Sequence, residues 1–411
     1  TSIGLGKLDC DTLGVAENAE QLSFAISSTE IVLASLAYFT VKEGEVFSDG
    51  KARKMWIGNV LDATGEVSAP SSTISMTWTD DCTVEDFLLK MVTFHADGPT
   101  TVIKSKPCPA GSNNDLCIVK VKLSEEAAEH AREEGENNPD LADKDKDISM
   151  LKKYLSASEE KKEEFHKMGL RRHSKNRYVM PSSRKLEAGT QARIDVVLLY
   201  TSSAYSGSTA SQLETEITTA YGGTNTAFAN SNVDLEINVV RVAETSYSEA
   251  SKTSSDILTD LTNGLVNDAH SLRDECSADL VQLITQLSAS CGRGYVLNPV
   301  TSGHLNFGTS VVDVDCLDNL SHTHEIGHNL GCYHDFTNSG AQTHPYAYGF
   351  RYCDDSNNIR TVMSYNSGCG SGATRINYFS NPGVSWTDGR VLGSSTANNA
   401  QQIRDSMVST S

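Results

Sequence analysis

The stretch HEIGHNLGCYHD, from His324 to Asp335, constrains this chain of 411 residues more than any other feature of its sequence. On a helix, positions i and i+4 lie one turn apart on one face, so His324 and His328 can direct their rings to a common point. Gly331 favours a helix end, because glycine adopts the left-handed conformation without strain. The chain can then reverse and bring His334 back as a third nitrogen ligand.

Three neutral imidazoles leave one position of a tetrahedral Zn²⁺ open for water, as in catalytic zinc sites. Zinc lowers the pKa of that water to about 7 and polarises a substrate carbonyl. Glu325 directly follows the first histidine and is placed to accept the proton of the zinc-bound water and pass it to a leaving amine. The pattern therefore predicts peptide-bond hydrolysis with Glu325 as the general base.

The motif resembles that of the metzincin zinc endopeptidases, HExxHxxGxxH, and Asp335 after the third histidine is similar to the adamalysin/reprolysin (ADAM-like) branch. The segment RTVMSYNSG (Arg360–Gly368) supplies Met363 for the methionine turn that such enzymes have beneath the metal. The resemblance implies an α/β catalytic domain over 191–411, with a twisted mixed sheet and an active-site helix. It also implies that Gly331, Asp335 and Met363 support the site rather than bind the metal.

Tyr365 follows Met363 by two residues and is similar to the tyrosine of astacins and serralysins. In those families it binds zinc when substrate is absent and then swings away to stabilise the oxyanion. The alternative is a packed tyrosine that lines the substrate pocket. The resemblance further implies a pocket walled by about Ser364–Phe379, and a substrate that pairs with an edge strand within Arg293–Phe307.

The C-terminal half alternates strand and helix patterns. A near-continuous apolar strand at Arg193–Thr201 indicates that both of its faces are covered. Helical spacing over Ser211–Asn230 and Ser254–Glu275 alternates with strands, which we expect at Leu235–Ala243, Ala278–Leu287, Gly292–Leu297 and Thr309–Asp315. This alternation predicts a largely parallel sheet with right-handed crossovers.

The N-terminal half differs from the C-terminal half in its pattern of apolar, turn and charged residues. Residues 1–122 alternate short apolar runs with turn residues and predict a β-rich domain. Residues 123–190 are dense in charge and predict a solvated helical or disordered linker. The linker contains the basic clusters Leu170–Arg177 and Ser182–Lys185, which are either a processing site or a solubilising charge run.

The N-terminal region resembles the prodomains of adamalysin-type enzymes, so we expect a zymogen-like proform inhibited by its own prodomain. Soft sulfur binds zinc well, and Cys108 in KSKPCPAG is the candidate for a thiolate switch at the fourth zinc position. A local disulfide with Cys117 is the alternative. Latency through a carboxylate or through simple steric cover also remains open.

Composition narrows the class of protein. A net charge of −19 without a basic stripe argues against nucleic acid and anionic membranes as partners. No apolar run approaches the length of a membrane span, and the longest, Ile31–Phe39, predicts a buried strand or a short helix. Ten cysteines without a CxxC pair favour disulfides and hence a secreted, extracellular protein.

Together these features predict a secreted zinc metalloendopeptidase that acts on protein or peptide substrates. The alternative is a non-catalytic binding or adhesion module that retains the metzincin fold. The intact Glu325 disfavours this alternative, because a pure binding module has no use for a base beside the metal. The oligomeric state stays open.

Overall fold

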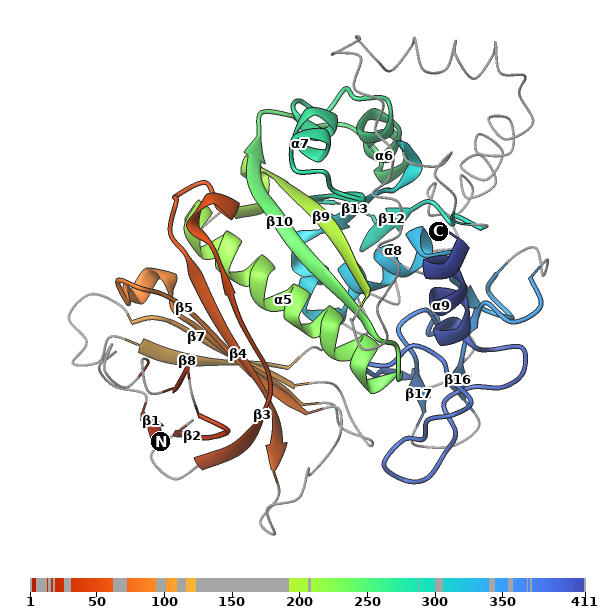
Figure 1. Cartoon of the computed structure of the whole chain (residues 1–411), viewed down its shortest axis with the longest axis horizontal. Helices are drawn as coiled ribbons and strands as arrows, with labels where there is room; N and C mark the ends of the chain where they lie inside the picture. The colour runs from red at the N-terminus through yellow and green to blue at the C-terminus, as the bar shows by residue number, and fades with distance from the viewer. Residues whose placement is uncertain are drawn as a thin grey trace.

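The computed structural model describes residues 2–4, 13, 16–17, 19–25, 31–61, 72–93, 101–108, 116–122, 192–205, 208–287, 289–298, 300, 306–339, 344–353, 358–367, 369 and 372–409. The predicted linker 123–190, with its basic clusters and the candidate processing site, lies outside the described residues. In the ribbon view, the N-terminal strands and the C-terminal sheet lie on either side of one long helix (Figure 1).

A five-stranded sheet organises the C-terminal half, in the order β10-β9-β11-β13-β12. The strands are β9 (Ala192–Thr201), β10 (Leu235–Thr245), β11 (Leu280–Thr285), β12 (Gly292–Gly294) and β13 (Thr309–Asp313). The pairs β10–β9, β9–β11 and β11–β13 are parallel, whereas β12 runs antiparallel to β13 at the edge. The predicted mixed α/β fold is therefore confirmed.

Both faces of this sheet are covered. Val196, Leu198 and Tyr200 of β9 belong to one buried cluster, and Val197 and Leu199 belong to another. Successive side chains of β9 therefore point to opposite faces of the sheet. Because both faces are buried, the strand is a continuous apolar run in the sequence. The first cluster lies with α5 (Ala210–Asn230), α8 (Ser321–Asn329) and α9 (Asn399–Ser409), and the second with α6 (Ser254–Thr262) and α7 (Ala269–Glu275).

The single helix expected over Ser254–Glu275 is wrong, because the structure divides this segment into α6 and α7. Gly264 has a φ of +71°, and the amide of Leu265 donates to the carbonyl oxygen of Asp260 at 2.8 Å. A left-handed glycine with this backward bond ends a helix. The apolar residues after Gly264 continue the helical spacing in the sequence and so conceal the break.

The N-terminal half forms an eight-stranded sheet in sequence order, β1 to β8. Its strands are β1 (Ser2–Gly4), β2 (Gln21–Ala25), β3 (Ile31–Lys42), β4 (Arg53–Leu61), β5 (Thr73–Thr79), β6 (Leu88–Thr93), β7 (Thr101–Pro107) and β8 (Leu116–Lys122). The apolar run Ile31–Phe39 is thus part of a strand rather than a helix. One buried cluster lies in this half and includes Trp56 and Trp78.

The N-terminal sheet packs on the outer side of α5 (Figure 1). The hydroxyls of Thr77 and Thr219 lie 2.7 Å apart, and a Cβ atom added at Gly222 would lie 2.3 Å from Cδ1 of Ile57. A guanidinium nitrogen of Arg53 lies 3.3 Å from a carboxylate oxygen of Glu214, and both side chains are fully buried. The contact between the halves is therefore close and partly ionic.

A second ionic contact joins the N-terminal sheet to the segment before α8. The ammonium groups of Lys90 and Lys104 lie 2.5 and 2.7 Å from the carboxylate of Asp318, in the 3₁₀ helix η5 (Val314–Asn319). The two lysines hold the pKa of Asp318 well below its usual range, against the opposing effect of burial. The N-terminal sheet thus contacts the residues that lead into the helix carrying the HExxH motif.

Short elements complete the fold. They are β14 (Tyr333–Asp335), β15 (Tyr348–Gly349), β16 (Arg351–Tyr352), β17 (Ile359–Arg360) and β18 (Thr374–Arg375), with the 3₁₀ helices η1 (Gly44–Val46), η2 (Val84–Asp86) and η3 (Ser202–Tyr205). Disulfides join Cys108 to Cys117, Cys291 to Cys316 and Cys353 to Cys369. Among the described cysteines, Cys276 and Cys332 are free thiols.

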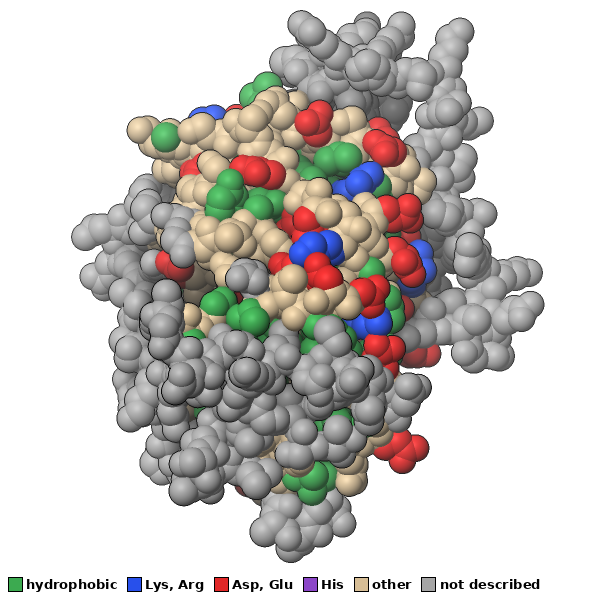
Figure 2. All heavy atoms as spheres, turned by 90° about the vertical axis from the view of Figure 1, so that its left-hand side faces the viewer, with side chains coloured by type: hydrophobic (Ala, Val, Ile, Leu, Met, Phe, Trp, Pro, Cys, Tyr) green, Lys and Arg blue, Asp and Glu red, His purple; other side chains and the backbone are tan. Residues whose placement is uncertain are grey.

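One face of the described part of the molecule carries mixed charge (Figure 2). On the face shown in Figure 2, Lys and Arg side chains stand among Asp and Glu side chains rather than gathering into one patch. Within the described segments, we find no helix with the length and hydropathy of a membrane span.

Candidate metal centre

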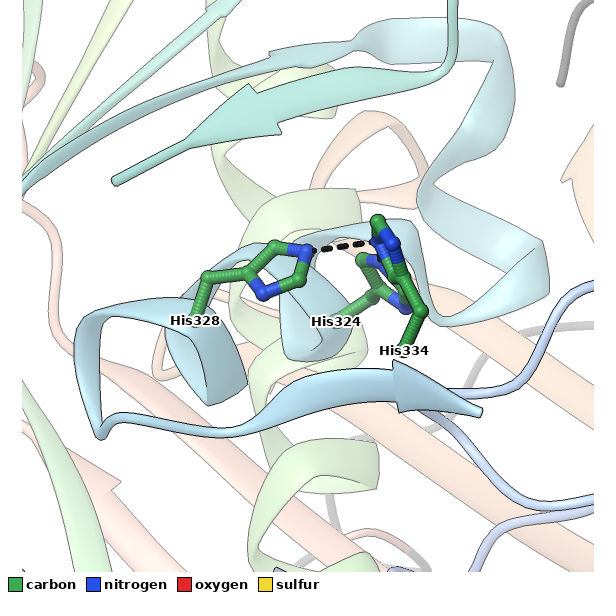
Figure 3. Close-up of side chains that lie close together, drawn as sticks. All are labelled: His324, His328 and His334. Atoms are coloured by element: carbon green, nitrogen blue, oxygen red, sulfur yellow. Dashed lines mark hydrogen bonds between the residues drawn. The ribbon is translucent and has the colours of Figure 1, made fainter. Parts of the chain in front are cut away.

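The three predicted histidine ligands converge on one point (Figure 3). His324 and His328 project from α8, and His334 comes from β14 after the chain reverses. The Nε2 atom of His334 lies 2.9 Å from that of His328 and 3.1 Å from that of His324. The ring of His324 lies 20° from parallel to that of His334 and nearly perpendicular to that of His328.

Backbone carbonyls fix the direction of two of these rings. The Nδ1 atom of His324 lies 2.8 Å from the carbonyl oxygen of Val362, and the Nδ1 atom of His328 lies 2.8 Å from that of Cys332. A carbonyl oxygen only accepts, so each Nδ1 carries the proton and each neutral ring presents an Nε2 lone pair to the centre. Burial also holds the pKa of His324 well below its usual value, which keeps that ring neutral.

These three residues fit a small divalent metal ion. Tetrahedral coordination with bonds of about 2.0–2.1 Å separates two ligand nitrogens by roughly 3.4 Å, close to the distances between the Nε2 atoms here. Neutral imidazole suits zinc and also suits copper, iron and nickel. The histidines therefore form a candidate metal site, while the donor set alone does not identify the metal.

The ends of α8 position its histidines. Leu320 precedes the helix in a left-handed conformation with a φ of 69°. Gly331 follows it with a φ of +84°, and its amide donates to the carbonyl oxygen of His328 at 2.9 Å. A Cβ atom at Gly331 would also lie 2.7 Å from the carbonyl oxygen of Leu297. Both the backbone conformation and the lack of space for a Cβ atom thus require glycine at position 331. The helix ends at this glycine, as the sequence predicted.

Glu325 lies against the edge strand β12. The residue is only 5% exposed. A Cβ atom added at Gly292 would lie 2.7 Å from its Oε1 atom, and one added at Gly294 would lie 3.1 Å from its Oε2 atom. These two glycines leave the space that the carboxylate occupies. The sequence analysis missed them, because their need for glycine arises from a residue about 30 positions further along the chain.

Met363 packs beneath the metal-binding turn of α8. Its side chain is fully buried, and a Cβ atom at Gly327 would lie 2.4 Å from its Sδ atom. Gly327 lies between His324 and His328 in the sequence, so only a glycine at this position allows Met363 to approach the helix so closely. The packing is compatible with the supporting role that the sequence predicts for Met363, which stays a prediction.

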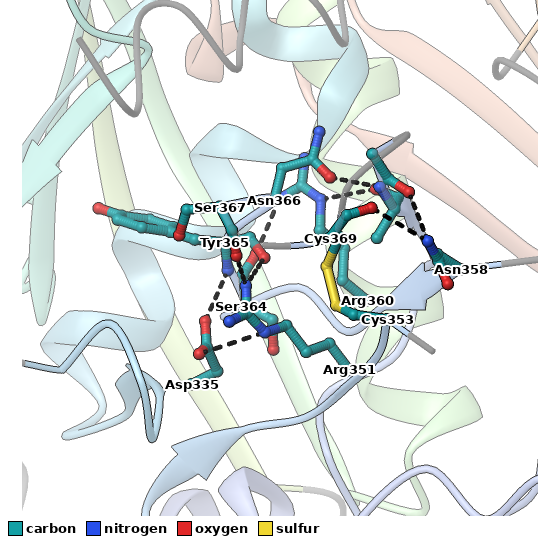
Figure 4. Close-up of a disulfide and its surroundings, with 12 residues drawn as sticks. Asp335, Arg351, Cys353, Asn358, Arg360, Ser364, Tyr365, Asn366, Ser367 and Cys369 are labelled. Atoms are coloured by element: carbon teal, nitrogen blue, oxygen red, sulfur yellow. Dashed lines mark hydrogen bonds and ion pairs between the residues drawn. A yellow bond between two sulfur atoms is a disulfide. The ribbon is translucent and has the colours of Figure 1, made fainter. Parts of the chain in front are cut away.

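Asp335 joins the strand of His334 to the methionine turn (Figure 4). Its carboxylate accepts from the amide of Tyr365 at 3.0 Å, and the Nε of Arg351 lies 3.4 Å away. Arg351 in turn donates to the carbonyl oxygen of Tyr365 at 2.9 Å. Asp335 and Arg351 thereby fix the backbone after Met363. Arg351 was not singled out by the sequence analysis, since no local motif marks it.

Tyr365 lies beside the histidines. The centre of its ring is 4.1 Å from that of His334 and 6.0 Å from that of His324. This placement fits either interpretation of Tyr365, as an oxyanion-stabilising group or as a wall of the pocket.

His322 lies away from the three histidines and packs against α5. Its ring contacts Tyr221, and its Nε2 lies 3.0 Å from the carbonyl oxygen of Ala220.

The thiolate switch expected at Cys108 is contradicted by the structure. Cys108 forms a disulfide with Cys117, the alternative that the sequence left open. A sulfur atom in a disulfide has no thiolate to offer a metal ion. The disulfide therefore removes Cys108 from the candidates for latency.

Comparisons with known proteins agree with this geometry. Residues 190–380 match the model of metallo-peptidase family M12, Reprolysin_5. A "Peptidyl-Asp metalloendopeptidase" of Stenotrophomonas maltophilia is 30% identical over 225 residues, which cover 53% of this chain and 51% of that protein. A protein of the same name from Xanthomonas campestris is 30% identical over 242 residues, covering 55% and 54%.

Among solved structures, metalloproteinase-II from Bacteroides fragilis is similar with a TM-score of 0.43 and 14% identity, over 81% of this chain and 88% of that one. The chain spans about half the length of the curated relatives named above. The family match and the names of the relatives support a metalloendopeptidase, a hydrolase with a catalytic metal. They do not confirm the ADAM-like branch inferred from Asp335.

Proposed function

We propose that this chain is a zinc-dependent metalloendopeptidase that hydrolyses peptide bonds in proteins, with Glu325 as general base. The observation that carries the proposal is the convergence of three Nε2 atoms within 4.8 Å of one another, with Glu325 on α8 beside His324. Catalytic zinc sites have three protein ligands and one open position, whereas structural sites are closed by four.

Each residue has a distinct role in this proposal. His324, His328 and His334 would hold zinc through Nε2, and the carbonyls of Val362 and Cys332 keep two of the rings in the required tautomer. When bound, zinc supplies Lewis-acid chemistry that lowers the pKa of water and polarises a carbonyl. The Glu325 carboxylate takes one proton from the attacking water and then delivers it to the leaving amine nitrogen.

We also propose a preference for bonds that adjoin aspartate. The names of the relatives support this preference, because each is a "Peptidyl-Asp metalloendopeptidase". Substrate would lie along β12, the edge strand that contacts Glu325. Tyr365, beside His334, would line the site and donate to the oxyanion.

We propose further that the protein is secreted as a proform whose N-terminal half restrains the enzyme. The three disulfides among the described residues support an oxidising compartment. The packing of the N-terminal sheet on α5 and Asp318 supports a role for residues 1–122 in holding the proform together.

A peptidase assay on the full chain, with and without limited proteolysis of the linker, tests the function. Glu325→Gln keeps the size of the side chain and removes the base, so we expect activity to fall by about 10²- to 10⁴-fold with metal content unchanged. Equal activity of the two proteins would dismiss Glu325 as the base. A folded, metal-loaded chain that cleaves no peptide would instead favour the binding or adhesion module.

A further inference from the structure

We propose that Arg351 is a positioning residue, which holds Tyr365 in the place from which its phenol acts in the reaction. The inference rests on the proposed function, because that function gives Tyr365 the task of donating to the oxyanion. Arg351 lies on β16 and acts on Tyr365 through the backbone of the turn after Met363.

Both backbone polar groups of Tyr365 are held. Its amide donates to the Oδ2 atom of Asp335 at 3.0 Å, and its carbonyl oxygen accepts from the Nη1 atom of Arg351 at 2.9 Å (Figure 4). These two groups lie on opposite sides of the Cα atom, so bonds to both limit rotation about φ and ψ. An aspartate and an arginine from two other segments therefore set the direction in which the side chain of Tyr365 leaves the backbone.

The guanidinium group of Arg351 has three partners at once. Besides the carbonyl oxygen of Tyr365, its Nη1 atom donates to that of Ser367, and its Nε atom lies 3.4 Å from the Oδ1 atom of Asp335. The side chains of Arg351 and Asp335 are 13% and 5% exposed, so little water competes for these bonds. Arginine presents its donors in a rigid planar fork, whereas lysine has one ammonium group on a flexible stem. We therefore expect lysine to replace Arg351 only in part.

Further hydrogen bonds extend this network to the third histidine. Asp335 directly follows His334 on β14, and its two carboxylate oxygens accept from the Nδ2 atom of Asn338 at 3.0 and 2.9 Å. The hydroxyl of Ser367 donates to the Oδ1 atom of Asn338 at 2.6 Å. These bonds join the segment after His334 to the same turn that Arg351 holds.

The position of Tyr365 matters because its ring lies beside the metal centre. The centre of the ring is 4.1 Å from that of His334, and the two ring planes are 34° apart. Tyr365 is only partly buried, whereas Met363 is fully buried. Packing in the core therefore fixes the ring of Tyr365 less firmly than it fixes Met363. Without Arg351, the carbonyl group of Tyr365 would lose its anchor and the ring would be free to shift relative to His334.

Loss of Arg351 should affect the rate more than metal binding. The rings of His324 and His328 take their direction from the carbonyl oxygens of Val362 and Cys332, so we expect the metal content to be retained. A misplacement of about 1 Å costs roughly 10²-fold in rate, and removal of an oxyanion donor costs roughly 10²- to 10³-fold. We expect Arg351→Gln to lower kcat by about 10- to 100-fold and to change KM by less than about threefold.

A double-mutant cycle tests whether Arg351 acts through the phenol of Tyr365. The constants kcat and KM are measured for the unmodified full chain, Arg351→Gln, Tyr365→Phe and the double variant, each after the same limited proteolysis of the linker. Each single change should lower kcat, but in the Tyr365→Phe chain Arg351→Gln should lower it further by less than about threefold. Losses that multiply would show a merely structural role and overturn the inference. Arg351→Lys should lose less of kcat, and it takes the place of Arg351→Gln if that protein does not fold.

Arg390→Gln is the matched control. The side chain of Arg390 is 18% exposed and also pairs with an aspartate, Asp388 at 2.7 Å, but it lies beyond the turn that contains Tyr365. We expect kcat, KM and metal content near those of the unmodified chain. An equal loss of kcat in Arg390→Gln would trace the effect to general destabilisation and count against the inference.

Amide hydrogen exchange gives a second readout that needs neither metal nor turnover. In the metal-free chain, the amides of residues 364–367 should exchange at least about tenfold faster in Arg351→Gln, and at unchanged rates in Arg390→Gln. Unchanged exchange in Arg351→Gln, or unchanged kcat in Tyr365→Phe, would overturn the inference and leave the metalloendopeptidase proposal intact. An unmodified chain that cleaves no peptide would count against the proposed function, and hydrogen exchange would then decide the inference by itself.

Discussion

Replacing Gly292 with alanine should damage catalysis without damaging the fold. The added Cβ atom would lie 2.7 Å from Oε1 of Glu325, whereas ordinary van der Waals contact begins at 3.4 Å. The carboxylate must therefore move by about 0.7 Å. Because a misplacement of about 1 Å at a reacting group costs roughly 10²-fold in rate, we expect kcat to fall by about 10- to 50-fold.

Stability should change little, for two reasons. The three atoms that the new Cβ atom would meet all belong to the side chain of Glu325, and Gly292 is absent from the residues with positive φ, so alanine fits its backbone. We therefore expect the free energy of unfolding to change by less than about 1 kcal/mol. KM and metal content should also stay near those of the unmodified chain, because neither the pocket wall nor the histidines move.

The assay measures kcat and KM on a quenched fluorescent peptide, together with urea unfolding and bound metal. Gly223→Ala is the matched control, since its Cβ atom would meet only Leu320, at 3.8 Å. Gly294→Ala, with its contact at 3.1 Å, should give an intermediate loss of kcat. A folded, metal-loaded Gly292→Ala protein with unchanged kcat would refute the proposed position of the base.

Three further changes test other parts of the structure. Gly327→Ala would bring a Cβ atom to 2.4 Å from Sδ of Met363, so we expect a loss of about 1–3 kcal/mol in urea unfolding, partly recovered by Met363→Ala in the same chain. Unchanged stability would show that the methionine does not support the helix. Burial raises the pKa of Asp279 to about 6, above an unfolded value of about 3.9, so its carboxyl group costs stability as the pH rises through this interval. Asp279→Asn should therefore stabilise the protein at pH 7.5 but not at pH 3.5, and an equal gain at both would contradict this reasoning. Replacing Cys108 and Cys117 by serine should lower the free energy of unfolding by about 2–3 kcal/mol without raising peptidase activity; a gain of activity would revive a latency role for this disulfide.

Local spacing explains what the sequence could predict of the site. The convergence of His324, His328 and His334 depends on one helical turn, one glycine end and a short reversal, all within the stretch His324–His334. The strands β9, β10, β11 and β13 were also predictable, because apolar runs alternate with helical spacing. Each of these features is encoded by neighbouring residues.

Contacts between distant residues explain what it could not predict. The glycines that admit Glu325 are recognisable only once β12 is placed against α8. The buried pair of Arg53 and Glu214 joins residues in different halves of the chain, and neither has a local pattern that marks it. The break between α6 and α7 was missed for a different reason. Gly264 adopts a positive φ and ends α6, although apolar residues at helical spacing continue beyond it in the sequence.

Metal analysis of purified variants tests the central claim most directly. We expect one equivalent of zinc per unmodified chain, and loss of that zinc when His324, His328 or His334 is replaced by alanine. His322→Gln should retain it, because the ring of His322 contacts α5 instead of the metal centre. Zinc that persists after replacement of all three residues, or an unmodified folded chain that binds none, would contradict the account.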